Sequence, residues 1–551
     1  MSRIVAFVFN DCTTDARVLR EAASLARAGH TVTIMARPRD PKSTEVERER
    51  RDGFEIVRIP LPTGWKRWYI LARYPWRGRW WVRFRLFYDL RRGPAGWVEL
   101  LWLLPVTVAW LAWTAVRTPS QLLYRRTHPE RPAGGDTIDW LTRWQWSIGG
   151  WARAAAAAAP DADAYHGHDL SGLPGAIAAA TMRGRHGPGT RPAVVYDSHE
   201  IYVESGRMAK LPGWARRVLV HQERSWVGRI DALVTVNQSL AEDLGRRYAP
   251  RRVVVVRNCP ARWQPPEGRP DLLRRAAGIP AGSPVILYHG GFSAHRGMEE
   301  ILDSLLEPGM ERVHAVFLGY GSERANLVAR VADPRYGGRA HVLDAVPPHE
   351  LPPWVASADL GVMPIQRSTL NHYLSTPNKL FESLAAGVPV VASDFPEMRR
   401  IVLDDPDAPL GAVCDPADPS SIARAIRSVL ERPADETAAL RARCLRAAHE
   451  RYNWETEVSR LVSLYRDLLG DGSVEAAVAA TEAAEAEELA AGNEGDASLP
   501  MTPAPDGTLA AGGADDDTVA DNDAIAPDGH AVAAGDPAMA ADPAPEAAGD
   551  G

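Results

Sequence analysis

A short polar run in the last third of this 551-residue chain has the residue types that bind a phosphorylated ligand. Ser375, Thr376 and Asn378 form a turn-prone stretch before a predicted helix, whose first turns carry Lys379 and Glu382. A helix start presents unpaired backbone N–H groups and a partial positive charge, which suit a diphosphate. A lysine in the first turn disfavours a helix by itself, so an anionic ligand would account for Lys379. Glu382 could accept hydrogen bonds from the paired hydroxyls of a sugar, although an ordinary surface helix would also accommodate both side chains.

The same run resembles part of a known family. PNKLFESLAAGVPVVAS (residues 377–393) is similar to the nucleotide-sugar segment of the retaining family 4 glycosyltransferases, which have the GT-B fold. The resemblance implies that Glu382 binds the ribose hydroxyls of the donor and that Lys379 lies on its phosphate side. The family signature has a second glutamate, with seven residues between the two, and Leu374 stands at that position here. Contacts to the sugar ring of the donor are therefore left without an assigned residue.

A glycine turn precedes another predicted helix. In GGFSAHRG (residues 290–297), Gly290 and Gly291 would let the backbone approach a ligand closely, and Arg296 stands just before the helix. The pattern resembles the pyrophosphate loop of the family, which implies that Arg296 stabilises the leaving group. A further cation that is usual after the glycine is absent, because Phe292 and Ser293 stand there; a surface arginine on a plain strand–turn–helix unit is the alternative. By the same resemblance, the expected donor-binding residues are Gly290, Gly291, Arg296, Gly319, Gly321, Val346, Ser375, Thr376, Asn378, Lys379 and Glu382.

Two histidine-plus-acid pairs follow predicted strands in the first half of the chain. His168 and Asp169 end the strand in ADAYHGHDL, and His199 and Glu200 follow the strand in AVVYDSHE. The carboxyl ends of strands are where α/β sheets bind ligands. Each histidine alone would more often be structural, but two such pairs in one domain favour an acceptor site, and both strings resemble family 4 segments. We count His168 with Arg296 and Lys379 as the candidate catalytic residues.

Asp15 and Arg17 open the first predicted helix, in the string DARVLREAASL. This pattern also resembles family 4, and the resemblance implies that both residues face the interdomain cleft on the acceptor side. A helix N-cap and a solvated arginine would explain the two residues equally well.

For the donor-side candidates to lie close together, the strands before them must end at the same edge of one sheet. The acceptor-side candidates need the same arrangement in a second sheet. Residues 4–9, 16–28 and 31–35 predict a strand, a helix and a strand, which begin a doubly wound α/β sheet. No G-x-G-x-x-G follows the first strand, which disfavours a dinucleotide-dependent dehydrogenase. With a Pro-rich linker at 260–270, the prediction is two Rossmann-like domains that face a cleft. Their ranges are 1–268 for the acceptor domain, 269–440 for the nucleotide-sugar domain and 441–472 for a helix that packs back on the first domain.

Residues 64–151 interrupt the first domain and hold thirteen of the eighteen tryptophans. Residues 97–116 are almost wholly apolar, and about 20 such residues are enough to span a bilayer. A single crossing would, however, separate strands that belong in one sheet, and the arginines that flank both ends indicate no orientation. We therefore expect a helical insertion that lies in the interface of an anionic membrane. An apolar hairpin buried against protein is the alternative, and the aliphatic content disfavours nucleic-acid binding.

Charge is divided unevenly along the chain. Residues 473–551 carry eighteen Asp and Glu and no Lys or Arg, so the formal charge of −7 divides into −18 for this stretch and +11 for residues 1–472. The stretch has almost no aromatic residues, which predicts a disordered acidic tail, while the basic remainder favours an anionic partner. The four cysteines lack C-x-x-C spacing, which fits a reducing cytosol and argues against a zinc site.

The combined prediction is a metal-independent, retaining glycosyltransferase that moves a sugar from a nucleotide diphosphate sugar, its co-substrate, to a hydroxyl. The membrane-associating insertion favours a lipid-linked or glycan acceptor, a peripheral place at the cytoplasmic face of the cell membrane, and a role in cell-envelope glycan or glycolipid assembly. No metal, other cofactor or nucleic acid is expected. Two alternatives remain: a sugar-nucleotide 2-epimerase of the same fold, and a catalytically silent, membrane-bound binding module, which the Leu374 departure keeps open.

Overall fold

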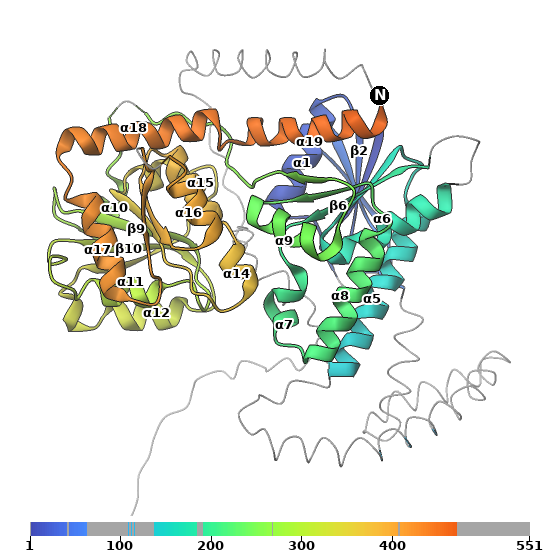
Figure 1. Ribbon diagram of the computed structural model, residues 1–551, viewed down its shortest axis with the longest axis horizontal. Helices are drawn as coiled ribbons and strands as arrows, with labels where there is room; N and C mark the ends of the chain where they lie inside the picture. Colours follow the sequence, from blue (N-terminus) through green and yellow to red (C-terminus); the bar gives the residue numbers. More distant parts are fainter. Residues whose placement is uncertain are drawn as a thin grey trace, which may run out of the picture.

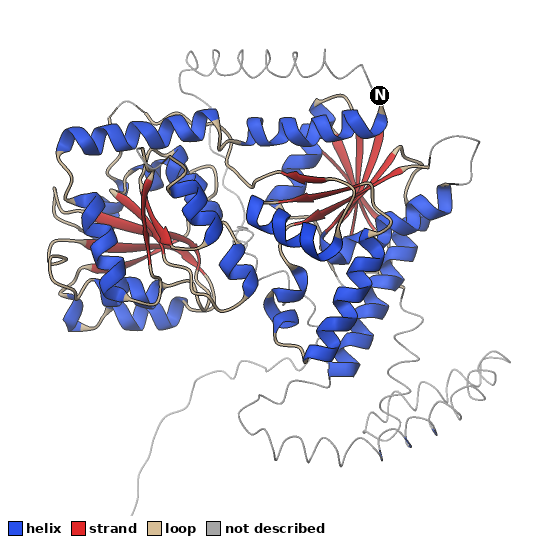
Figure 2. Ribbon diagram, viewed as in Figure 1, coloured by secondary structure: helices blue, strands red, loops and turns tan. Residues whose placement is uncertain are grey.

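The computed structural model describes residues 2–40, 43–62, 137–184, 191–266, 268–405 and 408–470, together with residues 108, 112 and 115. These residues form two α/β units that lie side by side, each built around its own sheet (Figure 1). Helices cover both faces of each sheet, and the strands of each sheet fan out with a marked twist (Figure 2).

The first sheet has eight strands in the order β3-β4-β2-β1-β5-β6-β7-β8, and all neighbours are parallel except β3 and β4. Near-continuous apolar runs such as those of β1 and β7 suit strands that are buried on both faces. The strand order reverses between β1 and β5, and this switch point is where open α/β sheets bind ligands. The strands are β1 (Arg3–Phe7), β2 (Thr31–Ala36), β3 (Glu47–Arg51), β4 (Phe54–Arg58), β5 (Ala164–His168), β6 (Ala193–Ser198), β7 (Ala232–Thr235) and β8 (Val253–Val255).

The helices of the first unit are α1 (Ala16–Arg27), α5 (Thr137–Ala158), α6 (Asp169–Arg183), η1 (Tyr202–Glu204), α7 (Gly206–Ala209), α8 (Gly213–Val227) and α9 (Gln238–Tyr248). Helix α6 lies directly against β1, because a Cβ atom on Gly172 would stand 2.2 Å from the carbonyl oxygen of Phe7. This close contact holds the first turns of α6, which begins directly after His168 of β5, against the carboxyl end of β1.

Helix α5 shows that the inserted segment ends earlier than the expected residue 151. Trp144, Ile148 and Trp151 are buried in the first unit, and the ring of Trp151 packs edge-on against Phe7 and Phe9. Trp144, Ile148 and Trp151 are therefore part of the core of the first unit. The remainder of the expected insertion, including most of residues 97–116, lies outside the described residues, as does the expected acidic tail.

The second sheet has six parallel strands in the order β11-β10-β9-β12-β13-β14. Its strands are β9 (Val285–Gly291), β10 (His314–Tyr320), β11 (Ala340–Asp344), β12 (Leu360–Met363), β13 (Val390–Ser393) and β14 (Gly411–Cys414). Its helices are α10 (Leu272–Ala277), α11 (Met298–Ser304), α12 (Arg324–Val331), η2 (Pro334–Tyr336), α13 (Leu351–Ala356), α14 (Leu370–Leu374), α15 (Asn378–Ala385), α16 (Pro396–Val402) and α17 (Pro419–Leu430).

Two consecutive helices at the end of the described chain, α18 (Ala434–Glu450) and α19 (Trp454–Leu469), run across both units (Figure 1). Leu440 and Cys444 of α18 are buried in the core of the second unit, whereas Leu461 and Tyr465 of α19 are buried in the first. The side chain of Asn453 caps α19 between them. The return to the first domain, expected from residue 441, is thus made by α19, and the first half of the segment belongs to the second unit.

No helix among the described residues is both long enough and apolar enough to cross a bilayer.

Candidate active site

The carboxyl ends of β5 and β6 bring a charged cluster together in the first unit. Arg17 binds Asp197 with two hydrogen bonds of 3.1 Å, and it donates a third, of 2.8 Å, to the carbonyl oxygen of Val256. Both side chains are buried. Asp15 caps α1 by accepting a hydrogen bond from the N–H of Val18, as the N-cap alternative expects. The solvated arginine of that alternative is wrong for Arg17, because this guanidinium is an interior group that joins α1 to β6.

His199 lies between two carboxylates in this cluster. Its ring nitrogens are 3.4 Å from Asp169 and 3.2 Å from Asp197. Burial alone would lower the pKa of His199, but the two carboxylates outweigh it and raise the pKa to about 10. His199 therefore carries a positive charge at neutral pH. His168 lies 3.4 Å from the His199 ring, so the two expected strand-end histidines do meet.

Asp169 occupies the junction between β5 and α6 with a φ of 54°, the left-handed region in which aspartate is uncommon. Burial raises the pKa of its carboxyl, although the charge of His199 works in the opposite direction. Strained backbone of this kind is concentrated at functional sites. The strain supports the assignment of this strand end to ligand binding.

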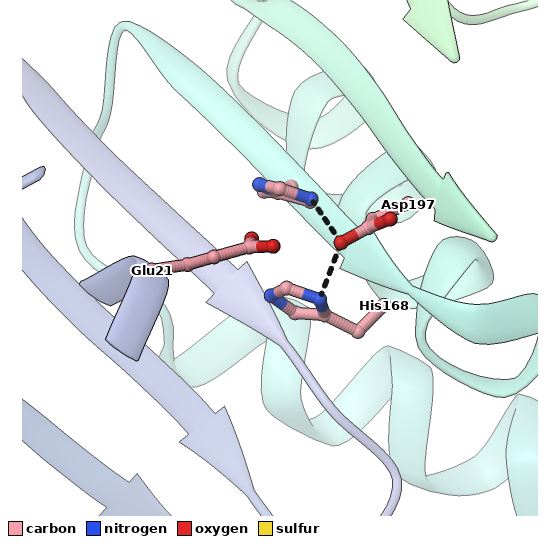
Figure 3. Close-up of side chains that lie close together, drawn as sticks. Glu21, His168 and Asp197 are labelled. Carbon is pink, nitrogen blue, oxygen red and sulfur yellow. Dashed lines mark ion pairs between the residues drawn. The ribbon is translucent and has the colours of Figure 1, made fainter. Parts of the chain in front are cut away.

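Glu21, His166, His168 and Asp197 have the spacing of a metal site, since one ligand atom from each lies within 4.8 Å of the others. Figure 3 shows the side chains of Glu21, His168 and Asp197 pointing toward one another. Arg17, however, contacts Glu21 at 3.1 Å as well as Asp197, so both carboxyl groups already face a cation. A divalent ion would have to displace this guanidinium from a buried position. The residues therefore suit an internal ion-pair network better than a metal.

The expected donor-binding residues lie around the carboxyl ends of the strands of the second sheet. Gly290 and Gly291 end β9, Gly319 is on β10, Gly321 follows β10, Val346 follows β11, Ser375 and Thr376 connect α14 to α15, and Asn378, Lys379 and Glu382 are on α15. A Cβ atom on Gly319 would lie 1.9 Å from the carbonyl oxygen of Gly290, so the two strand ends approach as closely as backbones can.

The first turn of α15 has no side-chain cap. Its N-cap is Pro377, which provides no side-chain hydrogen bond to the free N–H groups of that turn. Lys379 is buried, with its Nζ 3.9 Å from the centre of the Tyr288 ring, and Tyr288 is itself fixed by a hydrogen bond to the carbonyl oxygen of Gly291. Within the described part of the chain, Lys379 forms no ion pair.

Arg296 lies on the loop that follows the same strand, β9. It is buried, and its Nε donates to Ser293 Oγ at 3.2 Å. Gly297 behind it has a φ of 79°, and a Cβ atom there would meet the carbonyl oxygen of Pro364 at 2.1 Å. The loop is therefore held tightly against the chain that follows β12, and both expected donor-side cations belong to the surroundings of the β9 carboxyl end.

Comparison with known proteins gives the family. Residues 283–432 match the model of the glycosyl transferases group 1, and residues 124–259 match that of the glycosyl transferase 4-like domain. The chain belongs to the GT-B glycosyltransferases of the family 4 type. The predicted family and fold class are thereby confirmed.

Curated relatives match this family 4-type chain over part of their length. Glycogen synthase of Mycobacterium tuberculosis is 27% identical over 274 residues, which are 48% of this chain and 60% of the relative. D-inositol 3-phosphate glycosyltransferase of Xylanimonas cellulosilytica is 31% identical over 257 residues, 44% of this chain and 58% of the relative. The chain thus spans about 60% of the length of these relatives.

Solved structures share the fold at low sequence identity. Sucrose-phosphate synthase from Thermosynechococcus elongatus superposes with a TM-score of 0.55 at 17% identity, covering 85% of this chain and 100% of that one. The E. coli trehalose-6-phosphate protein bound with UDP-2-fluoro glucose gives 0.56 at 12% identity, with 85% and 99% covered. These likenesses concern the fold alone.

The family 4-type signature departs at Leu374 for a reason that the structure makes visible. Leu374 is buried in an apolar cluster that includes Leu170, Ile201 and Leu240 of the first unit. A carboxylate at this position would face that apolar surface without a partner. Helix α14 is therefore an interdomain contact here, and Leu374 is part of the packing between the units.

Polar contacts between the units surround the same segment. Asn237 donates to the carbonyl oxygen of Leu374 at 2.9 Å and to Thr376 Oγ1 at 3.1 Å. Glu200, expected on the acceptor side, accepts a hydrogen bond of 3.0 Å from Asn371, so the second unit holds its carboxylate. Sequence reasoning missed Asn237 and Asn371, because nothing in the local pattern indicates which residues meet across two domains.

Two further residues of the site have local signals that sequence reasoning did not use. His289 is a polar residue within the apolar run of β9, and its Nε2 lies 2.8 Å from Glu382 Oε2. Glu397, in the first turn of α16, is fully buried and accepts hydrogen bonds from the backbone of Gln238 and Ser239. In the sequence, each is a titratable residue within or just after an apolar strand run, and this pattern would have identified both.

Proposed function

We propose that this chain transfers a sugar from a nucleotide diphosphate sugar to a hydroxyl acceptor, with retention of anomeric configuration and without a metal. The single observation that carries the proposal is Lys379, a buried cation in the first turn of a helix whose start no side chain caps. A buried cation that forms no ion pair within the described residues favours an anionic ligand, although the Glu382 carboxylate is near enough for the two charges to interact. Diphosphate is the anion that both the lysine and the free N–H groups fit.

In the proposed chemistry, the main contribution to the activation free energy is the negative charge that develops on the departing diphosphate. Lys379, Arg296 and the start of α15 would stabilise the negative charge that develops as the sugar leaves. Fixed donors that are already oriented in a closed site can contribute several kcal/mol to such a step. Glu382 would bind the ribose hydroxyls of the same nucleotide, and the relationship to a fold seen with UDP-2-fluoro glucose supports this type of donor.

The acceptor would bind at the carboxyl ends of β5 and β6. There His199 supplies a positive charge, and His168 beside it offers an imidazole to an acceptor hydroxyl. Similarity to glycogen synthase and to D-inositol 3-phosphate glycosyltransferase supports a polyhydroxylated acceptor. A lipid-linked or glycan acceptor in cell-envelope assembly is the form that we propose.

Contact with an anionic membrane at the cytoplasmic face is the remaining part of the proposal. Trp146 of α5 and Trp214 and Val218 of α8 are 47% to 48% exposed, and α8 also exposes Arg217 and Arg224. Exposed indole rings beside arginines suit the headgroup region of a bilayer. We expect the full chain to sediment with anionic vesicles and not with zwitterionic ones; equal sedimentation with both would contradict the electrostatic part.

The catalytic proposal is tested with the full chain and a panel of UDP, GDP and ADP sugars. One class of nucleotide sugar should raise the midpoint of thermal unfolding. Lys379→Met should weaken binding of that nucleotide sugar at least tenfold. Lys210 is an exposed lysine of the first unit, and the control Lys210→Met should leave the binding unchanged. Inversion of the donor sugar at C2 with no acceptor present would favour the epimerase. Tight donor binding without transfer to any glycan or lipid-linked acceptor would favour the binding module.

A further inference from the structure

The side chains of His289 and Glu382 connect the centre of the second sheet to its ligand-binding edge. His289 lies on β9 and Glu382 on α15, and His289 Nε2 is 2.8 Å from Glu382 Oε2. Only 2% of the His289 side chain is exposed, whereas 32% of the Glu382 side chain is. One end of this hydrogen bond is therefore fixed in the interior, and the other end belongs to a carboxylate that reaches solvent.

A glutamate on a helix surface normally rotates about three side-chain bonds, and fixing it for a ligand costs conformational entropy. The hydrogen bond from His289 removes much of that freedom before any ligand arrives. It occupies only Oε2, and no hydrogen bond to Oε1 occurs within the described part of the chain. The carboxylate is thus held in one orientation with an oxygen left for a ligand.

The charge state of this carboxylate follows from its neighbours. Burial raises the pKa of Glu382, but the hydrogen bond from His289 and the positive charges of Lys379 and Arg20 outweigh burial and lower the pKa below its usual value. Glu382 therefore remains an acceptor at neutral pH. Because a carboxylate can only accept, the His289 ring must carry its hydrogen on Nε2 to make the bond.

We propose that His289 is a positioning residue that holds Glu382 in the orientation needed to bind the ribose hydroxyls of the donor nucleotide. The proposal rests on the function proposed above, because it assigns the donor as a ribonucleotide whose paired hydroxyls meet Glu382. His289 itself does not touch the ligand in this assignment. Its effect passes through the carboxylate, so it should influence donor affinity and leave the chemical step nearly unchanged.

The test compares His289→Leu, which removes the donor group, with His289→Gln, whose amide N–H can replace it. The probe is the nucleoside diphosphate whose sugar gives the largest thermal shift, together with its 2′-deoxy and 3′-deoxy forms, measured by titration calorimetry. The matched control is His314→Leu, which lies at the other end of the adjacent strand β10. Melting curves of each variant show whether it remains folded.

We expect His289→Leu to weaken binding of the ribonucleotide about tenfold and to raise the donor KM by a similar factor, with kcat changed less than about threefold. His289→Gln should recover most of this loss, and His314→Leu should bind as the unsubstituted protein does. The preference for the ribonucleotide over its deoxy forms should largely disappear in His289→Leu, because the carboxylate that reads the hydroxyls is no longer oriented.

Unchanged affinity in a folded His289→Leu variant, or a preference for ribose that survives the substitution, would overturn the assignment of His289 while leaving the proposed transferase intact. If no nucleoside diphosphate binds the unsubstituted chain, the proposed function fails, and the role of His289 fails with it.

Discussion

Arg17 and Asp197 lie 180 positions apart in the chain and form a bidentate ion pair in the interior of the first unit, with Nε–Oδ2 and Nη2–Oδ1 distances of 3.1 Å. Burial alone would raise the pKa of Asp197, but Arg17 and His199 hold it well below its usual range. The pair joins α1 to the carboxyl end of β6, and His199 follows that strand directly.

Replacing Arg17 with leucine should lower the free energy of unfolding by about 3–5 kcal/mol, because Asp197 would remain buried without its partner. Chemical denaturation measured at neutral pH checks this value. Arg252→Leu is the matched control, since its partner Asp467 is about half exposed and such pairs contribute under about 1 kcal/mol. A loss for Arg17→Leu no larger than that of the control would show that the interior pair adds little.

Glu21 should make stability depend on pH between about 4.5 and 7. Burial raises its pKa from 4.5 to about 7, although Arg17 opposes this shift. In that window the folded chain binds more protons at Glu21 than the unfolded chain, so stability falls as the pH rises through it. Glu21→Gln should remove this dependence. The free energy of unfolding of the variant minus that of the unsubstituted chain should therefore rise by about 1–3 kcal/mol from pH 4.5 to pH 8. Denaturation midpoints at the two pH values test the prediction, and a difference that does not change with pH would contradict it.

Glu397 should control how firmly the two units are held together. It is fully buried and accepts hydrogen bonds from the N–H groups of Gln238 (3.3 Å) and Ser239 (3.0 Å) at the start of α9, in the other unit. Glu397→Ala leaves these donors without an acceptor, which costs about 1–3 kcal/mol. Small-angle scattering should then report a larger radius of gyration. Glu242→Ala, which removes an exposed contact to Arg400 across the same boundary, is the control and should leave the radius unchanged.

Gly319→Ala should abolish donor binding by displacing the end of β9. A Cβ atom on Gly319 would stand 1.9 Å from the carbonyl oxygen of Gly290, and two backbones cannot make room for it without moving. Gly245→Ala is the control, because nothing lies within 4 Å of its Cβ position on α9 and alanine favours a helix by about 0.5–1 kcal/mol. Nucleotide titration and thermal unfolding measure both effects. Normal donor binding by Gly319→Ala would show that the ends of β9 and β10 do not line the site.

The sequence predicts much of the fold, because its signals are local. An apolar run, then a helix with apolar residues at helical spacing, then Gly29 and a second apolar run place β1, α1 and β2. The strand-end positions of His168 and His199 follow from the same kind of pattern. The interior position of Arg17 does not, since its partner Asp197 is far along the chain. Leu374 is similar: its character as an interdomain contact depends on Leu170 and Leu240, which only the tertiary structure brings to it.

Helix α19 has a consequence for how the two halves of the molecule can move. The chain passes from one half to the other twice, near Pro260 and near Trp454, and these passages are tied by a hydrogen bond of 2.9 Å between Trp454 N and Pro260 O. Two adjacent covalent connections resist sliding and twisting of one half against the other, but they permit rotation about the line that joins them. Opening for substrate entry should therefore be a swing about one axis. If the chain is cut between the halves, the first half also loses the helix that covers His30 and His166, so the first half is not a self-sufficient fragment.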